Sequence, residues 1–323
     1  MQKQSQRSAK LVQSSQPERR KMLITLAVVG VIALASGIAS AVYFWPPKSK
    51  NGQQTVTQSH RTYSLNLHTS AYQANQPTEL MFDIRDENNN VLKDFDTVHE
   101  KLLHLIVVRK DRSYFQHVHP NFDKASGMFT LTGFKFPTDG EYRVFADFTA
   151  SSAQMGPDGM KLTATPYRDV KVGSGSYAAQ PLGGDNMTST ANGLVTTMSL
   201  MGDDTPTPQP YATLPLTLGI TIDKDGAAYK NLQPYLGALG HMVVLGPNLE
   251  YIHAHALDEA TIAQTGLIAF HVTFPDPGQY KLYLQTQADG QVNTTDYTYT
   301  VKPMPSSSSN SNDSMPGMDH MGH

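Results

Sequence analysis

The chain has 323 residues, with 25 Lys and Arg against 28 Asp and Glu, and its formal net charge is -3. A nearly neutral chain without a stripe of Lys and Arg gives no support for nucleic-acid binding. The absence of cysteine excludes disulfides, thiolate metal sites and cysteine nucleophiles. The length suits two domains of ordinary size once an anchor and a tail are set aside.

The N-terminus predicts a membrane anchor. Residues 1–21 form a basic segment with six Lys and Arg against one Glu, and residues 22–45 carry no charge. An apolar run of this length can cross a bilayer as a helix, and its basic flank is expected to stay in the cytoplasm. We therefore expect a single-pass protein of the cell membrane whose domains are extracytoplasmic. Cleavage as a signal peptide near Ala39-Ser40-Ala41 is the alternative.

The remainder of the chain has the pattern of short β-strands. Alternating apolar runs are separated by Gly, Pro, Asn and Asp, and no long helical period occurs. We predict an all-β fold of two tandem immunoglobulin-like β-sandwich domains, preceded by one N-terminal transmembrane helix. The expected boundaries are a stalk over 46–62, domain 1 over 63–172, a linker over 173–192, domain 2 over 193–302 and a low-complexity tail over 303–323.

One histidine pattern occurs once in each predicted domain. Each copy is an apolar run that begins with His, a short polar turn, and a second run that ends in His-x-His. This is the pattern of a β-hairpin. The histidines are His104, His117 and His119 in the first copy and His241, His253 and His255 in the second.

The positions of the turns predict how the histidines pair. A turn centred directly after Lys110 would place His104 opposite His117, and the equivalent assignment places His241 opposite His253. Side chains alternate along a strand, and opposed residues lie about 5 Å apart at Cβ, so three imidazoles of each hairpin would share one face. Imidazole is a good ligand for Cu(II), Zn(II) and Ni(II). Each hairpin is therefore a candidate metal site.

Other histidines carry weaker signals. In domain 2, His271 alternates with apolar neighbours and could add a fourth ligand if strand order brings it to the His241 cluster, whereas the equivalent position in domain 1 is Gly133. His60, His68 and His99 have no such spacing, and we expect them to be structural. The competing interpretation of the hairpin histidines is that they are polar side chains bonded to backbone and water.

The C-terminal tail provides a separate metal signal. Thioether sulfur is a soft ligand that selects Cu(I), and imidazole accepts either oxidation state of copper. An ordinary disordered terminus is the alternative, because serine and asparagine precede these residues. The candidate ligands within the last nine residues are Met315, Met318, His320, Met321 and His323.

A second motif repeats at the same distance beyond each hairpin. Phe136-Pro-Thr-Asp-Gly-Glu-Tyr142 in domain 1 matches Phe274-Pro-Asp-Pro-Gly-Gln-Tyr280 in domain 2. Together with the hairpins, these motifs resemble bacterial extracytoplasmic tandem immunoglobulin-like proteins with His-x-x-Val-Val and His-x-His motifs. Those proteins are thought to be associated with heavy metals, copper in particular. The resemblance covers most of residues 63–302 and implies a copper ligand set, with zinc possible; it departs where Ala256 replaces Pro120.

The sequence thus predicts a membrane-anchored, extracytoplasmic transition-metal binding protein for copper tolerance or delivery. Its expected partners are the membrane and a metal transporter or metal-receiving protein. No catalytic motif is present, so we do not expect an enzyme. The alternatives are an immunoglobulin-like interaction or scaffold protein of the cell envelope with incidental histidines, and a small copper oxidoreductase.

Overall fold

The computed structural model describes residues 53–54, 56–58, 61–69, 71–156, 159–174, 177–201, 211–256 and 266–304. The predicted cytoplasmic segment, the predicted anchor and the Met/His-rich tail lie outside these residues. Within the described ranges, no helix is long and apolar enough to span a membrane.

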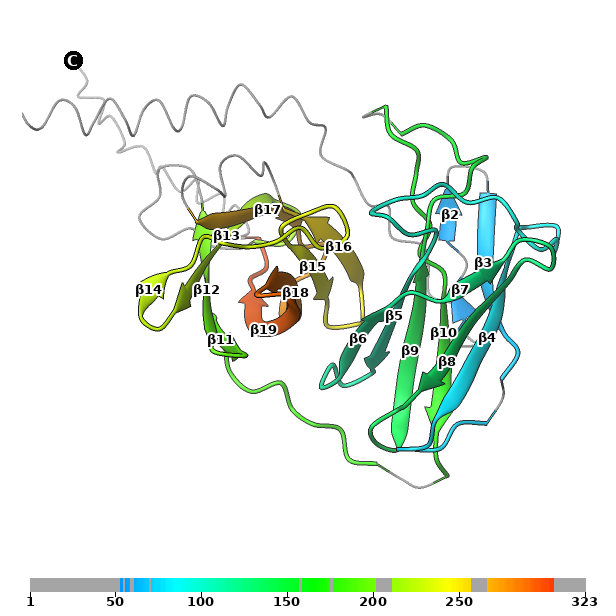
Figure 1. Ribbon diagram of the computed structural model, residues 1–323, viewed down its shortest axis with the longest axis horizontal. Helices are drawn as coiled ribbons and strands as arrows, with labels where there is room; N and C mark the ends of the chain where they lie inside the picture. The colour runs from blue at the N-terminus through cyan, green and yellow to red at the C-terminus, as the bar shows by residue number, and fades with distance from the viewer. Residues whose placement is uncertain are drawn as a thin grey trace, which may run out of the picture. The chain divides into compact units, whose positions relative to one another are not determined.

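All regular structure in the described part of the chain is β-strand, arranged as four sheets (Figure 1). Two sheets come from the first half of the chain and two from the second half. The predicted all-β fold of two repeated halves is therefore confirmed at this level.

In the first half, two five-stranded antiparallel sheets share one core. Their strand orders are β1-β10-β9-β5-β6 and β2-β3-β4-β8-β7. The core between them is rich in aromatic residues. It contains Leu105 and Val107 from the first sheet and Phe82 from the second. The strands are β1 (Gln53–Gln54), β2 (Val56–Gln58), β3 (Arg61–Leu67), β4 (Thr78–Arg85), β5 (His104–Arg109), β6 (Phe115–Val118), β7 (Asn121–Asp123), β8 (Met128–Phe134), β9 (Gly140–Asp147) and β10 (Tyr167–Val172).

The second half repeats this plan. One sheet contains β11, β12 and β13, with β14 and β17 both paired to β13, and the other follows the order β16-β15-β18-β19. Ile220 from the first sheet and Met242 and Leu282 from the second meet in a shared core. The strands are β11 (Thr188–Ala191), β12 (Leu194–Met201), β13 (Pro215–Lys224), β14 (Ala227–Ala228), β15 (His241–Leu245), β16 (Tyr251–His255), β17 (Leu267–Thr273), β18 (Gly278–Ala288) and β19 (Gln291–Val301).

The repeated Phe-Pro-x-x-Gly-x-Tyr motif forms the same corner in both halves. The hydroxyl of Tyr142 donates a hydrogen bond to the carbonyl oxygen of Thr138 at 2.8 Å, and Tyr280 donates to Asp276 at 2.8 Å. A buried tyrosine that bonds back to the chain a few residues upstream is the tyrosine corner of β-sandwiches. It fixes where β9 and β18 begin, and hence how each central strand aligns with the histidine hairpin.

The strands extend beyond the domain boundaries expected from the sequence. β1 and β2 fall in the segment expected to be a stalk, and β11 falls in the segment expected to be a linker. β1 pairs with β10, and β11 pairs with β12. Short polar edge strands lack the apolar alternation that identifies a strand in a sequence, so these segments gave no strand signal.

The predicted register of both hairpins is wrong by two residues. His117 pairs with Ile106 rather than with His104, and His241 pairs with His255 rather than with His253. The cause is a turn centred one residue later than expected, with Arg112 in one hairpin and Leu249 in the other at positive φ. Because side chains alternate with a period of two, a shift of two residues keeps every histidine on its predicted face.

The two halves are packed together through a third apolar cluster. The described residues of both halves, except those of the loop 155–161, fall in one compact unit. β5 and β15 are buried along their whole length because alternate residues face their own core and the other half. The cluster consists of Ile106, Val108, Phe115, Phe145 and Tyr167 from the first half and Val243, Leu245, Leu249, Tyr251 and Tyr283 from the second.

This contact is built from equivalent positions of the two halves. Phe115 stacks on Tyr283 with ring centroids 4.4 Å apart, and Phe145 stacks on Tyr251 at 4.9 Å. Phe115 and Tyr251 each lie two residues before the first histidine of His-x-His, and Phe145 and Tyr283 each lie three residues after the corner tyrosine. The same patch is therefore used on both sides, as in a two-fold symmetric dimer interface.

Candidate metal centre

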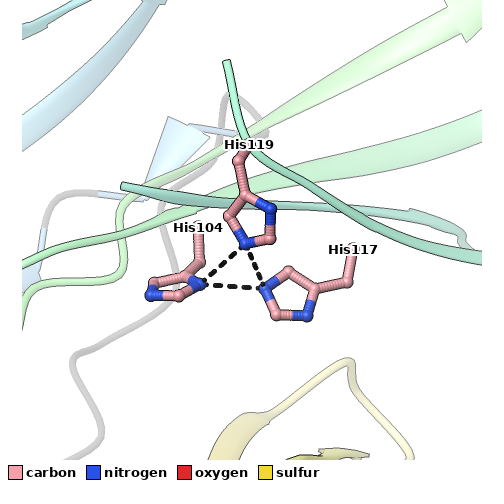
Figure 2. Close-up of side chains that lie close together, drawn as sticks. All are labelled: His104, His117 and His119. Atoms are coloured by element: carbon pink, nitrogen blue, oxygen red, sulfur yellow. Dashed lines mark hydrogen bonds between the residues drawn. The ribbon is translucent and has the colours of Figure 1, made fainter. Parts of the chain in front are cut away.

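The first histidine hairpin brings three imidazoles together. His104 starts β5, His117 lies in β6, and His119 directly follows that strand. Nδ1 of His104 lies 2.9 Å from Nε2 of His117 and 3.1 Å from Nε2 of His119, and the last two nitrogens are 3.2 Å apart (Figure 2). Nitrogens bound tetrahedrally to zinc at 2.0–2.1 Å are about 3.3 Å apart. The first triad (His104, His117, His119) is therefore close to the spacing of three metal ligands.

The outer nitrogens of this triad fix which nitrogen faces the centre. Nε2 of His104 lies 3.1 Å from the carbonyl oxygen of Val98, and Nδ1 of His117 lies 2.8 Å from Oε1 of Gln285. A ring nitrogen that donates its proton outward leaves the other nitrogen as a lone-pair ligand, and this is the usual arrangement around metal-binding histidines.

The second triad (His241, His253, His255) repeats this arrangement, with ligand atoms that all lie within 4.8 Å of one another. Nε2 of His241 lies 2.7 Å from the carbonyl oxygen of Tyr235, and Nδ1 of His253 lies 2.9 Å from Oδ2 of Asp147. The remaining nitrogens, Nδ1 of His241 and Nε2 of His253, are buried without a hydrogen-bond partner, as is Nε2 of His255. Leaving three buried acceptors unsatisfied is costly, and one metal ion would satisfy all three.

The surroundings keep these imidazoles neutral. Burial lowers the pKa of His119 to about 3 and that of His241 to about 4. Burial is also the main cause of the lowered pKa values of His104 and His117, and it acts with the neighbouring histidines on the other two rings, His253 and His255. Neutral imidazole is the form that binds metal, so the triads are ready for a cation without losing protons.

A buried carboxylate lies beside the two triads. Asp147 ends β9 opposite His104, and burial raises the pKa of Asp147. Its Oδ2 accepts hydrogen bonds from the hydroxyl of Tyr251 at 2.8 Å and from Nδ1 of His253 at 2.9 Å. A carboxylate bonded to the outer nitrogen of a histidine raises the basicity of the nitrogen that faces the metal.

The two triads contact each other. The ring of His253 lies 5.7 Å from that of His104 and 5.7 Å from that of His117, centroid to centroid, and the rings of His117 and His241 are 6.5 Å apart. Six imidazoles from four strands and their ends therefore form one cluster where the halves meet.

Sequence reasoning missed three residues of this cluster. His99, expected to be structural, stacks on His255 with ring centroids 3.7 Å apart and has a φ of 48°. The equivalent turn residue in the second half is Leu236, whose φ is 53°. Because this counterpart is apolar, comparing the two repeats in the sequence gives no metal signal for His99. Asp147 and Gln285 carried a weak signal, since both lie five residues after the corner tyrosine.

The other predicted ligands are placed differently. His271 is exposed on β17, its Nδ1 lies 3.0 Å from Oγ1 of Thr217, and it is not among the converging histidines. The expectation that it could complete the second triad is therefore wrong: the strand that carries it belongs to the other sheet of that half, and its side chain points away from the core. The five tail ligands, Met315, Met318, His320, Met321 and His323, lie outside the described residues.

Acidification is expected to destabilise the metal-free protein. The pKa of His241 is about 4 in the folded state and about 6.5 in an unfolded chain, so between these values only the unfolded state takes up the proton. The contribution of neutral His241 to the free energy of unfolding is therefore fully present above about pH 6.5 and is lost as the pH falls to 4. The loss is on the order of 3 kcal/mol. Urea unfolding at pH 7 and pH 4.5 measures this, and His241→Gln should show a smaller difference. Equal pH dependence in the two proteins would contradict this role of His241.

Comparisons with known proteins identify a family. A family model described as a domain of unknown function (DUF8832) matches residues 55–156 and 193–303. No curated protein sequence matches the chain. Among solved structures, Escherichia coli alpha-2-macroglobulin activated by porcine elastase is similar over 75% of this chain and 20% of its own length, with 12% identity and a TM-score of 0.23. The D00-D0 domain of intimin is similar over 73% of this chain and 98% of its own, with 11% identity and a TM-score of 0.18. The chain thus spans about a fifth of the first of these structures.

Proposed function

We propose that this chain, which belongs to the DUF8832 family through both of its halves, binds transition-metal ions in its two histidine triads. The physiological ion in this proposal is copper, with zinc as the alternative. Three imidazoles without thiolate or carboxylate ligands suit both, and Cu(II) binds such sites more tightly than the other divalent first-row metals.

One observation carries this proposal. In the second triad, the three nitrogens without a hydrogen-bond partner belong to the three histidines that converge, while the outer nitrogens of His241 and His253 are occupied. A histidine placed only for packing would have both nitrogens bonded or exposed to water. The outer nitrogens of His104 and His117 are occupied in the same way, which supports metal binding by the first triad as well.

The cellular setting is part of the same proposal. The uncharged run over 22–45 anchors the protein in the cell membrane, and two immunoglobulin-like sandwiches lie on the extracytoplasmic side. The tail residues Met315 to His323 capture copper, and the triads hold it for tolerance or for delivery to a transporter or receiving protein. Binding rather than catalysis is proposed, because the sequence carries no catalytic motif.

The test is the amount of metal that the chain retains once its Met/His-rich tail has been removed. After loading with Zn(II) or Cu(II) and dialysis, elemental analysis should find two ions per chain in a protein shortened to residue 304. Alanine at His104, His117 and His119 should remove one ion, and alanine at His241, His253 and His255 the other. The proposal would be contradicted if the shortened protein retained no ion while its circular dichroism spectrum showed a native fold.

A further inference from the structure

Each triad is completed by a residue from the other half of the chain. Gln285, on β18 of the second half, accepts from His117 of the first triad at 2.8 Å. Asp147, on β9 of the first half, accepts from His253 of the second triad at 2.9 Å. Each triad also has one outer bond to a backbone carbonyl of its own half, so the other half supplies one of the two outer bonds.

The two acceptors occupy equivalent positions. Asp147 pairs with His104 across β9 and β5, and Gln285 pairs with His241 across β18 and β15. The exchange is therefore reciprocal: the same position of each half reaches over to the same His-x-His position of the other. Because the exchange occurs in both directions, it is a property of the contact between the halves and not of a single loop.

The acceptors differ in charge, and each is held by its own partner. Asp147 also accepts from the hydroxyl of Tyr251 at 2.8 Å, and phenylalanine occupies the position equivalent to Tyr251 in the first half. Nε2 of Gln285 donates to Oγ1 of Thr294 at 3.2 Å, which directs Oε1 of Gln285 at His117. One triad thus has a carboxylate behind it and the other a neutral amide.

We infer that the two triads form one two-ion centre for divalent transition metals, in which Asp147 makes the second triad the tighter site and Gln285 makes the first triad the weaker one. The inference rests on the proposed function that the triads bind metal. A carboxylate behind a ligating histidine raises the basicity of that ligand and adds a negative charge near the cation, whereas an amide only orients the ring. Asp147 and Gln285 are positioning residues that touch ligands and not the ion.

The test is a Zn(II) titration of the intact chain, shortened only by its tail, in competition with a chelator. The unaltered protein should bind two ions with unequal affinities, and His253→Ala should remove the tighter step and His117→Ala the weaker one. Asp147→Asn should weaken the tighter step 10- to 100-fold, the usual effect of removing an outer partner. Gln285→Glu should strengthen the step that His117→Ala removes.

The double variant Asp147→Asn/Gln285→Glu exchanges carboxylate and amide between the halves. The tighter step should then disappear with His117→Ala instead of His253→Ala, a reversal that a merely structural role of either residue would not produce. Two bound ions whose affinities ignore both substitutions would overturn this inference and leave the proposed function standing. No bound zinc in the unaltered protein would overturn both.

Discussion

Loading the triads with Zn(II) or Cu(II) is expected to raise the free energy of unfolding by about 4 kcal/mol per triad, when the free ion is 1,000-fold above its dissociation constant. The ion binds only where three imidazoles converge, and unfolding separates them because His104 and His119 lie on different segments of the hairpin. Chemical unfolding with excess ion and with a chelator measures the difference.

The comparison needs a chain without the tail, because metal binding to the unfolded state reduces the stabilisation. The protein shortened to residue 304 should keep the full increase. His117→Ala and His253→Ala should each keep only the part that the other triad contributes, since each removes one triad. An increase that survives in the double variant would mean that the ions bind elsewhere.

Phe145→Ala is expected to lower the free energy of unfolding by about 3–5 kcal/mol, the usual cost of emptying a buried phenylalanine site. Phe145 is 1% exposed, stacks on Tyr251 and lies in the cluster shared by the two halves. Tyr251 donates to Asp147, so the loss should also weaken metal binding by the second triad. Urea unfolding and a zinc titration measure the two effects.

Phe129→Ala is the matched control for this substitution. Phe129 is also 1% exposed, but it packs on Phe82 within the core of the first half. The control should cost a similar free energy of unfolding and leave the zinc affinities unchanged. If both variants altered zinc binding equally, the contact between the halves would have no special connection to the site.

Much of the fold follows from local signals in the sequence. The alternating runs predicted strands, and the two corner tyrosines marked where β9 and β18 begin. The edge strands β1, β2 and β11 were not predicted, because polar residues at a sheet edge have no apolar face to reveal them. The error of two residues in the hairpin register came from Arg112 and Leu249, whose left-handed conformation no glycine or asparagine signalled.

The triads were predictable because a period of two is insensitive to that error. The approach of the triads to each other was not, since it depends on the packing of Ile106 and Val108 against the other half, and a continuous apolar run only shows that both faces of a strand are covered. His99, Asp147 and Gln285 entered the cluster through this same packing. Long-range contacts of this kind have no fixed spacing in the sequence.

Anomalous X-ray diffraction from crystals of the zinc-loaded protein tests the two-triad centre most directly. We expect two zinc peaks, one about 2.0–2.1 Å from Nδ1 of His104 and Nε2 of His117 and His119, and the other at the same distance from the three free nitrogens of the second triad. Zinc bound only at other residues, with the six imidazoles still bonded to one another or to water, would contradict the account.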